Sequence, residues 1–255
     1  MATATTLCAL LARFTAGIWF VDFEFYAPGG QRPVPLCMVA SELRSGQLIR
    51  LWIDDLRHLG RAPFDTGPGA LLVAYYASAE IACFLALGWP LPEHVLDLFA
   101  EFRNATNGLK LACGAGLLGA LSHHGLDSIQ AAEKESMRQL AMRGEPYSEE
   151  EKRGLLDYCQ TDVDALVLLL PKMATQLDLP RALLRGRYMK AAARIERTGI
   201  PIDVQTLNGL RRHWDQIKGR LVVEVDKGYG VYEGLTFKAE RWQTWCVARG
   251  IPASA

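Results

Sequence analysis

The stretch IWFVDFEFY, residues 18 to 26, places two carboxylates, Asp22 and Glu24, in the middle of an apolar run. The aromatic and β-branched residues around them predict a buried β-strand. Side chains two residues apart on a strand lie on the same face of the sheet, so these carboxylates would stand side by side. Burying an unpaired carboxylate costs free energy, and a like-charged neighbour raises that cost. Some compensating group is therefore expected beside this strand.

The segments that follow predict an α/β fold. Apolar segments separated by turns that contain Gly or Pro predict four further strands, over residues 35–43, 46–54, 67–76 and 93–99. Helices are predicted over residues 78–88, with Ser78 as the N-cap, and over residues 127–144. A longer helix begins after Ser148, because Glu151 follows it at capping-box spacing. Together these elements predict a mixed sheet of about five strands flanked by helices.

The charge distribution differs between the two parts of the chain. Residues 1–180 carry 14 basic and 21 acidic residues, whereas residues 181–220 carry 10 basic and 3 acidic ones. An acidic body followed by a basic segment indicates metal ions on one side and phosphates on the other. The alternative for the basic segment is a solvated helix face. Two helices are predicted there, over residues 181–199 and 204–228, and their apolar faces need a partner.

The cysteines and apolar runs exclude several classes of protein. The six cysteines are scattered and form no C-x-x-C pair, which argues against a zinc site or a disulfide framework. The first residues lack a basic leader before their short apolar run, and no run is long enough to span a membrane. We therefore expect reduced thiols and a cytoplasmic protein without a membrane partner.

Further acids stand at the ends of predicted elements. Glu80 lies in the first turn of a helix directly after the fourth strand. Asp162 lies inside the long helix, with Tyr158 four residues earlier on the same face. Carboxylates that converge from Asp22, Glu24 and these two positions would repel one another unless cations lay between them. Two divalent ions, Mg²⁺ or Mn²⁺, would satisfy them and would also activate a water molecule.

This set of residues resembles the DEDD superfamily of 3′→5′ exonucleases. VDFEF looks like the first motif of that family, with Asp22 and Glu24 as the acidic pair. DYCQTD looks like the third motif in its tyrosine form, because Asp157 stands where the histidine form needs His. The resemblance implies a ribonuclease H-like fold and two-metal-ion phosphodiester hydrolysis. It also implies that Tyr158 orients the attacking water while Asp22, Glu24, Glu80 and Asp162 bind the metal ions.

The second motif departs from the family pattern. Glu80 stands where the family has Asp, and the stretch YYAS replaces the usual upstream Asn. Glu also binds Mg²⁺ through oxygen, but its longer stem shifts the carboxylate by one methylene. Asp97, at the end of the fifth predicted strand, is the rival for the fourth ligand.

The second part of the chain narrows the resemblance. MKAAARIERTGIPID, residues 189–203, is similar to the start of the polymerase portion of family A DNA polymerases, and residues 237–252 continue that likeness. It implies an exonuclease domain over residues 1–178 and the helical start of a polymerase-like domain over residues 179–255. The polymerase portion of a longer chain and a frayed or single-stranded DNA 3′ end are the expected partners, in a bacterial or phage-infected host. We expect a monomer.

Four residues are predicted to contact the substrate, and two other groups are not. The predicted contacts are Phe23, Tyr76, Lys134 and Arg138. Adjacent histidines on a helix diverge, so His123 and His124 are interpreted as a surface pair rather than metal ligands. The tryptophans are assigned to packing, because Trp occurs more often in cores than on stacked bases.

The expected function is therefore a metal-dependent exonuclease that removes nucleotides from DNA 3′ ends during proofreading. Two alternatives stay open. One is an RNA 3′-trimming exonuclease of the same tyrosine subclass. The other is a degenerate domain that binds DNA or scaffolds a polymerase without cleaving it.

Overall fold

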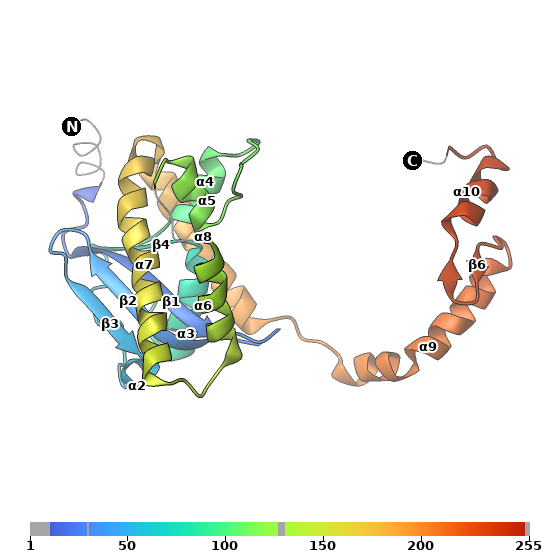
Figure 1. Ribbon diagram of the computed structural model, residues 1–255, viewed down its shortest axis with the longest axis horizontal. Helices are drawn as coiled ribbons and strands as arrows, with labels where there is room; N and C mark the ends of the chain where they lie inside the picture. The colour runs from blue at the N-terminus through green and yellow to red at the C-terminus, as the bar shows by residue number, and fades with distance from the viewer. Residues whose placement is uncertain (1–10, 30, 127–130, 253–255) are drawn as a thin grey trace. The chain divides into compact units, whose positions relative to one another are not determined.

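The computed structural model of the chain describes residues 11–29, 31–126 and 131–252. Its main sheet has five strands in the order β3-β2-β1-β4-β5 (Figure 1). β1 pairs antiparallel with β2 and parallel with β4, β2 pairs antiparallel with β3, and β4 pairs parallel with β5. The strands are β1 (Gly17–Tyr26), β2 (Val34–Glu42), β3 (Leu48–Trp52), β4 (Ala70–Ala74) and β5 (Val95–Asp97). The predicted mixed five-stranded sheet is confirmed.

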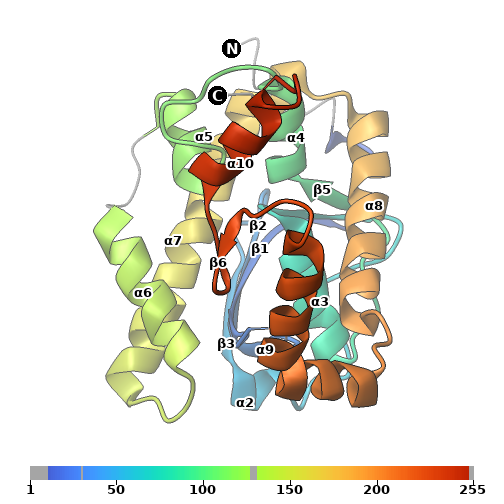
Figure 2. The same cartoon turned by 90° about the vertical axis from the view of Figure 1, so that its right-hand side faces the viewer.

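Helices cover both faces of this sheet. Figure 2 shows α6 and α7 on one side of β1 and β2, and α3 and α8 on the other. The helices of this part are α2 (Ile53–Leu56), α3 (Ala77–Leu87), α4 (Leu98–Ala105), α5 (Leu117–His123), α6 (Ala131–Arg143), α7 (Glu149–Met173) and α8 (Leu179–Thr198), with a 3-10 turn over Ala174–Gln176. Each face of the sheet has its own apolar cluster, so the sheet is buried on both sides.

β1 divides its side chains between the two apolar clusters. Ile18 and Phe20 are fully buried in the cluster that contains α7. Trp19, Val21 and Phe23 are buried in the cluster that contains α3. This alternation follows from the two-residue period of a strand. It also places Asp22 and Glu24, which continue the Ile18–Phe20 series, on the face that α7 covers.

Side chains of α8 bind to α4 and to the segment before β5. Arg185 donates through Nε and Nη2 to the buried Glu101 carboxylate, each at 2.6 Å. Lys190 Nζ donates to the carbonyl oxygens of Pro92, at 2.8 Å, and Glu93, at 2.9 Å. The chain divides into two compact units, Met1–Gly199 and Ile200–Ala255, and α8 is part of the first.

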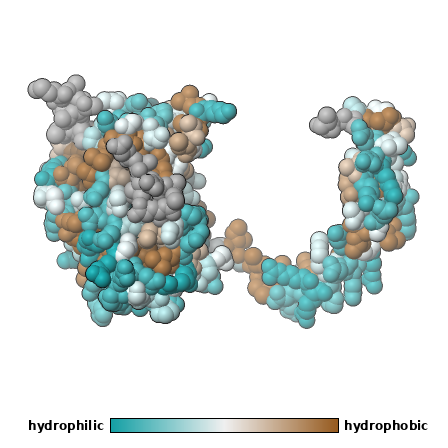
Figure 3. Space-filling view, in the orientation of Figure 1, coloured by the Kyte–Doolittle hydropathy of each residue, from teal (hydrophilic) through white to brown (hydrophobic). Residues whose placement is uncertain are grey.

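The second unit contains α9 (Val204–Asp226), a short hairpin of β6 (Tyr232–Glu233) and β7 (Thr236–Phe237), and α10 (Ala239–Val247). The hairpin was not predicted. Trp242 and Trp245 stack on each other with ring centroids 5.2 Å apart, so their predicted packing role holds. Along α9 only Val222 is buried, and Figure 3 shows apolar patches on the largely hydrophilic surface of this unit. Among the exposed apolar residues of α9 are Trp214, Leu221 and Val223.

The start of α3 differs from the predicted one. α3 begins after Tyr76, not after the predicted cap Ser78, which lies inside the helix and is buried. The first residues of the helix predicted over 127–144 fall outside the described part of the chain. Within the described residues, no helix combines the length and apolar character needed to cross a membrane.

Gly186 allows α8 to approach β5 closely, and its replacement tests this packing. A Cβ at residue 186 would collide with the carbonyl oxygen of Val95, whereas a Cβ at Gly154 in α7 would meet open space. We expect Gly186→Ala to lower the free energy of unfolding by about 2–3 kcal/mol. Gly154→Ala should leave it unchanged or raise it by about 0.5–1 kcal/mol, because Ala favours a helix. Urea unfolding measures both, and equal stability of the two variants would contradict the close contact.

Candidate active site

The acidic pair of β1 lies just beyond the end of β4. β4 pairs with β1 only as far as Phe20, while β1 continues to Tyr26. Asp22 and Glu24 are both partly buried and lie on one face of the strand. Because β4 ends early, the β1 backbone between the two acids is open toward α3. Glu80 of α3 uses this opening, and its carboxylate accepts a hydrogen bond from the Phe23 N–H.

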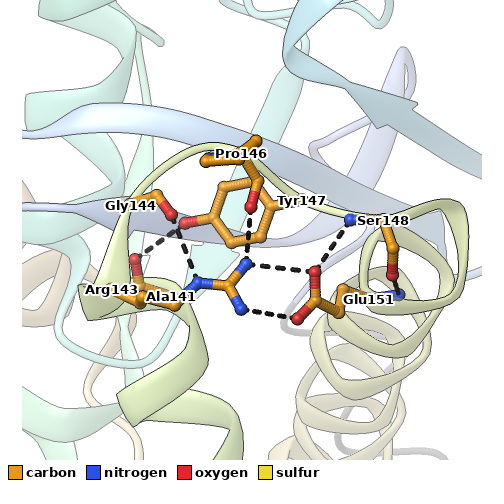
Figure 4. Close-up of polar contacts among 7 residues, drawn as sticks. All are labelled: Ala141, Arg143, Gly144, Pro146, Tyr147, Ser148 and Glu151. Carbon is orange, nitrogen blue, oxygen red and sulfur yellow. Dashed lines mark hydrogen bonds and ion pairs between the residues drawn. The ribbon is translucent and has the colours of Figure 1, made fainter.

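The start of α7 is fixed by a capping box. Glu151 N–H donates to Ser148 Oγ at 3.2 Å, and Ser148 N–H donates to Glu151 Oε2 at 2.8 Å (Figure 4). Arg143 makes two hydrogen bonds to the same carboxylate, which lower the pKa of Glu151 to about 2. The predicted cap is confirmed. A fixed start also fixes the helical register two turns later, where Tyr158 and Asp162 face the sheet.

α7 completes a cluster of three carboxylates. Oxygen atoms of Asp22, Glu24 and Asp162 all lie within 4.8 Å of one another. Three like charges at this separation, on partly buried and buried side chains, repel strongly. Carboxylate oxygens are the ligands that Mg²⁺ and Mn²⁺ prefer. The donor set therefore fits a divalent cation.

Tyr158 lies against this cluster and keeps its proton. Burial raises the pKa of its hydroxyl, and the negative charges of Asp162, Glu24 and Asp22 raise it further. The hydroxyl also donates a hydrogen bond to the Asp162 carboxylate one helical turn away. The side chain is only 8% exposed. A neutral, donating phenol is therefore held at the edge of the acidic cluster.

Glu80 approaches the cluster from α3. Burial raises the pKa of its carboxyl well above the usual range, and the charges of Asp22 and Glu24 add to this, against the Phe23 hydrogen bond. Its Oε2 atom is buried and has no hydrogen-bond partner within the described residues. A buried carboxylate oxygen without a partner, beside two more acids, is the environment that a bound cation would satisfy. The longer Glu side chain is thus compatible with the position where the family has Asp.

Asp97 is buried and connects the starts of two helices. Its Oδ1 atom accepts from the N–H groups of Tyr76 and Phe99, both at 2.9 Å, and from that of Ala100 at 3.4 Å. Asp97 is the N-cap of α4, and its bond to Tyr76 ties the start of α3 to it. These contacts give the rival ligand a structural role. Like Glu80, it lies outside the three-carboxylate cluster, and its Oδ2 atom is also buried without a hydrogen-bond partner within the described residues.

The four predicted substrate contacts occupy different environments. Tyr76 is 47% exposed at the start of α3, one turn before Glu80. The Phe23 ring is buried against Phe84 and Trp89, so this residue contributes its backbone N–H to the site. Arg138 is exposed on α6. Lys134 lies in the same helix, and its side chain falls outside the described part of the structure.

Two neighbours of the cluster escaped the sequence analysis. The Cys159 thiol donates to the Asp22 carbonyl oxygen at 3.2 Å and so ties α7 to β1 behind the acids. Asp97 was considered only as a possible metal ligand, because residues 93–99 were predicted as a strand and the start of α4 directly after Asp97 was not predicted. No sequence pattern links Cys159 to Asp22, because that contact arises only when α7 packs on the sheet.

Solved structures with the same fold include nucleases. A nuclease in its apo form is 17% identical, with a TM-score of 0.52, and the match covers 74% of this chain and 88% of that one. NrnC from Brucella melitensis with bound Mg²⁺ is 13% identical, with a TM-score of 0.51, over 74% of this chain and 89% of that one. The sequence itself matches no protein-family model and no curated protein.

A third structure shares the fold over part of its length. The catalytic core of RRP6 from Trypanosoma brucei is 17% identical, with a TM-score of 0.51. The match covers 74% of this chain and 49% of that one, so this chain spans about half of the RRP6 core. At such identities the likeness establishes the fold. The predicted ribonuclease H-like sheet with flanking helices is confirmed.

Metal addition should reveal the carboxylate cluster directly. We expect Mg²⁺ or Mn²⁺ to raise the melting temperature, with about 2.7 kcal/mol of stabilisation at a hundredfold excess over Kd. Asp22→Asn should lose this rise, yet melt above the wild type in chelator, because one repelling charge is gone. Asp164→Asn changes an exposed carboxylate of the same helix as Asp162 and should behave as the wild type. An unchanged metal response in Asp22→Asn would contradict the site.

Asp97 can be tested separately as an anchor. Asp97→Asn keeps an oxygen that accepts from the helix starts, so it should retain the metal-dependent rise in melting temperature. Asp97→Ala removes the acceptor and should lower the free energy of unfolding by about 2 kcal/mol. If Asp97→Asn stayed as stable as the wild type in chelator but no longer responded to metal, Asp97 would be a ligand instead.

Proposed function

We propose that this chain is a metal-dependent 3′→5′ exonuclease of the DEDD superfamily, tyrosine subclass, that acts on DNA 3′ ends. One observation carries the proposal: Asp22, Glu24 and Asp162 converge within 4.8 Å beside the protonated hydroxyl of Tyr158. The fold shared with a nuclease and with NrnC solved with Mg²⁺ supports it.

Each acidic residue has a defined part in this proposal. Asp22, Glu24 and Asp162 would hold Mg²⁺ or Mn²⁺ through carboxylate oxygens, and Glu80 would present its unpartnered Oε2 from α3. When bound, two such ions would lower the pKa of the attacking water and stabilise charge on the leaving oxygen. Without a cation the acids would repel the phosphodiester, so a bound cation should strengthen substrate binding.

Tyr158 orients the attacking water in this scheme. Its proton is engaged with Asp162, so toward a water molecule the hydroxyl oxygen would act as a hydrogen-bond acceptor. Its burial and the fixed start of α7 restrict the ring to one position. A water held this way already has the orientation for in-line attack, which lowers the entropic part of the barrier.

We further propose that the substrate is DNA and that the activity serves proofreading. The similarity of residues 189–203 to the start of a family A polymerase portion supports both points, and it makes that portion the proposed partner. The carboxylates would contact phosphate and not sugar, so RNA fits the same acids. A 3′-trimming ribonuclease is therefore the competing outcome of the substrate test.

Cleavage of end-labelled oligonucleotides tests the assignment. A 5′-labelled strand with a mismatched 3′ end should shorten from that end with Mg²⁺ or Mn²⁺, and chelator should stop it. Asp22→Ala should abolish cleavage. Tyr158→Phe keeps the packed ring but loses the hydroxyl, so kcat should fall about 10²-fold without loss of stability. Asp164→Asn is the matched control and should cleave normally.

Three other outcomes have distinct meanings. Faster cleavage of ribose than of deoxyribose strands would favour RNA trimming over proofreading. Binding without metal-dependent shortening would favour a degenerate DNA-holding domain. Normal cleavage by Asp22→Ala would contradict the site itself.

A further inference from the structure

Tyr76 has a backbone conformation that tyrosine rarely adopts. Its φ is 70° and its ψ is 54°, and among the described residues it is the one non-glycine position with positive φ. An L-residue avoids this region because its Cβ approaches the following carbonyl oxygen, and only Gly, Asn and Asp enter it readily. Such strain persists where the surroundings impose it, and it is concentrated at functional sites.

Two contacts hold Tyr76 in this conformation. Its N–H donates to Asp97 Oδ1 at 2.9 Å, and the same oxygen accepts from Phe99 at the start of α4. The Tyr76 and Phe99 rings meet edge to face, with centroids 5.1 Å apart. Both the backbone and the ring of Tyr76 are therefore anchored, although its side chain is nearly half exposed. An anchored aromatic surface loses little conformational entropy when a ligand stacks on it.

Tyr76 lies near the acidic residues along the chain and is bound to Asp97. It directly precedes α3 and stands four residues before Glu80, which lies in the first turn of that helix. Its anchor Asp97 lies close enough for its charge to act on Glu80. The length of one helical turn is comparable to the distance between the phosphate and the base of one nucleotide. A phosphodiester held at the acids would bring its terminal base to this ring.

The presence of tyrosine at position 76 needs an explanation of its own. The residues that suit this backbone, Gly and Asn, have no aromatic ring, and YYAS stands where the resemblance predicts Asn. Packing against Phe99 alone does not require an exposed ring. A role in contact with the substrate accounts for a strained tyrosine where Asn would fit without strain.

We infer that Tyr76 is the stacking platform for the 3′-terminal base of the substrate strand, positioned by Asp97. This role rests on the proposed function, since it assigns the substrate contact of the same site. Every base offers a π-face, so the platform accepts all four bases. A paired base is already stacked in its duplex, so the platform favours a frayed or mismatched end.

Three variants distinguish the effect of the Tyr76 ring from the effect of its backbone conformation. Tyr76→Phe keeps the ring and should leave KM unchanged. Tyr76→Asn suits the left-handed backbone but removes the ring, and KM should rise about tenfold while kcat stays within twofold, as expected for one base–aromatic stack. Tyr188→Asn removes an exposed ring on α8 and should change neither constant. Melting temperatures confirm that each variant is folded.

Fluorescence of a terminal 2-aminopurine supplies a readout that does not depend on cleavage. A strand with 2-aminopurine at its 3′ end and a hydrolysis-resistant phosphorothioate as its last linkage is titrated with the protein in Mg²⁺. The wild type, Tyr76→Phe and Tyr188→Asn should quench the fluorescence through stacking, and Tyr76→Asn should not.

The outcomes distinguish this role from the proposed function. Cleavage by the wild type with an unchanged KM in Tyr76→Asn, or equal quenching by that variant, overturns the stacking role alone. Quenching by the wild type that Tyr76→Asn loses, without any metal-dependent cleavage, overturns the exonuclease assignment and retains the stacking role. Absence of both cleavage and quenching in the wild type overturns both.

Discussion

Repulsion among carboxylates is the constraint on which the rest of this structure depends. β1 is buried on both faces, and its apolar neighbours leave Asp22 and Glu24 no freedom to move apart. Asp162 enters the same space, and Glu80 lies buried beside it. Folding therefore assembles a negative site that a divalent cation would neutralise. Stability and ligand binding are linked through this charge, because any species that binds only the folded cluster also stabilises it.

Helices on both faces of the sheet contribute side chains to the candidate site. α7 delivers Tyr158 and Asp162 over one face, while α3 delivers Glu80 from the other. The two sides can meet only because β4 ends at Ala74 and leaves the edge of β1 open toward α3. The strand lengths, and not only the acids, thus decide whether Glu80 can approach the three-carboxylate cluster. The Arg143–Glu151 pair and the capping box then fix the register of α7 (Figure 4).

Local strain accompanies this convergence. Asp97 Oδ1 accepts hydrogen bonds from backbone N–H groups at the starts of both α3 and α4. Tyr76 adopts a backbone conformation that residues with a side chain disfavour. Helix-start rules predicted Ser78 as the cap of α3, because Ser is a good N-cap and Tyr is not. The rules failed where tertiary contacts imposed another geometry. Functional sites are where a structure most often departs from local residue preferences, and here the departure lies next to buried acids.

The sequence by itself determined the five strands of the mixed sheet, the helix α7 and the capping box at Ser148, because these depend on side-chain periodicity and short-range hydrogen bonds. It also marked Asp22, Glu24 and Asp162, since acids within apolar elements need compensation. Only the tertiary structure decided that Asp97 anchors two helix starts, that the Phe23 ring is buried, and that α8 belongs to the first unit. Those outcomes depend on contacts between residues far apart in the chain, which no local pattern encodes.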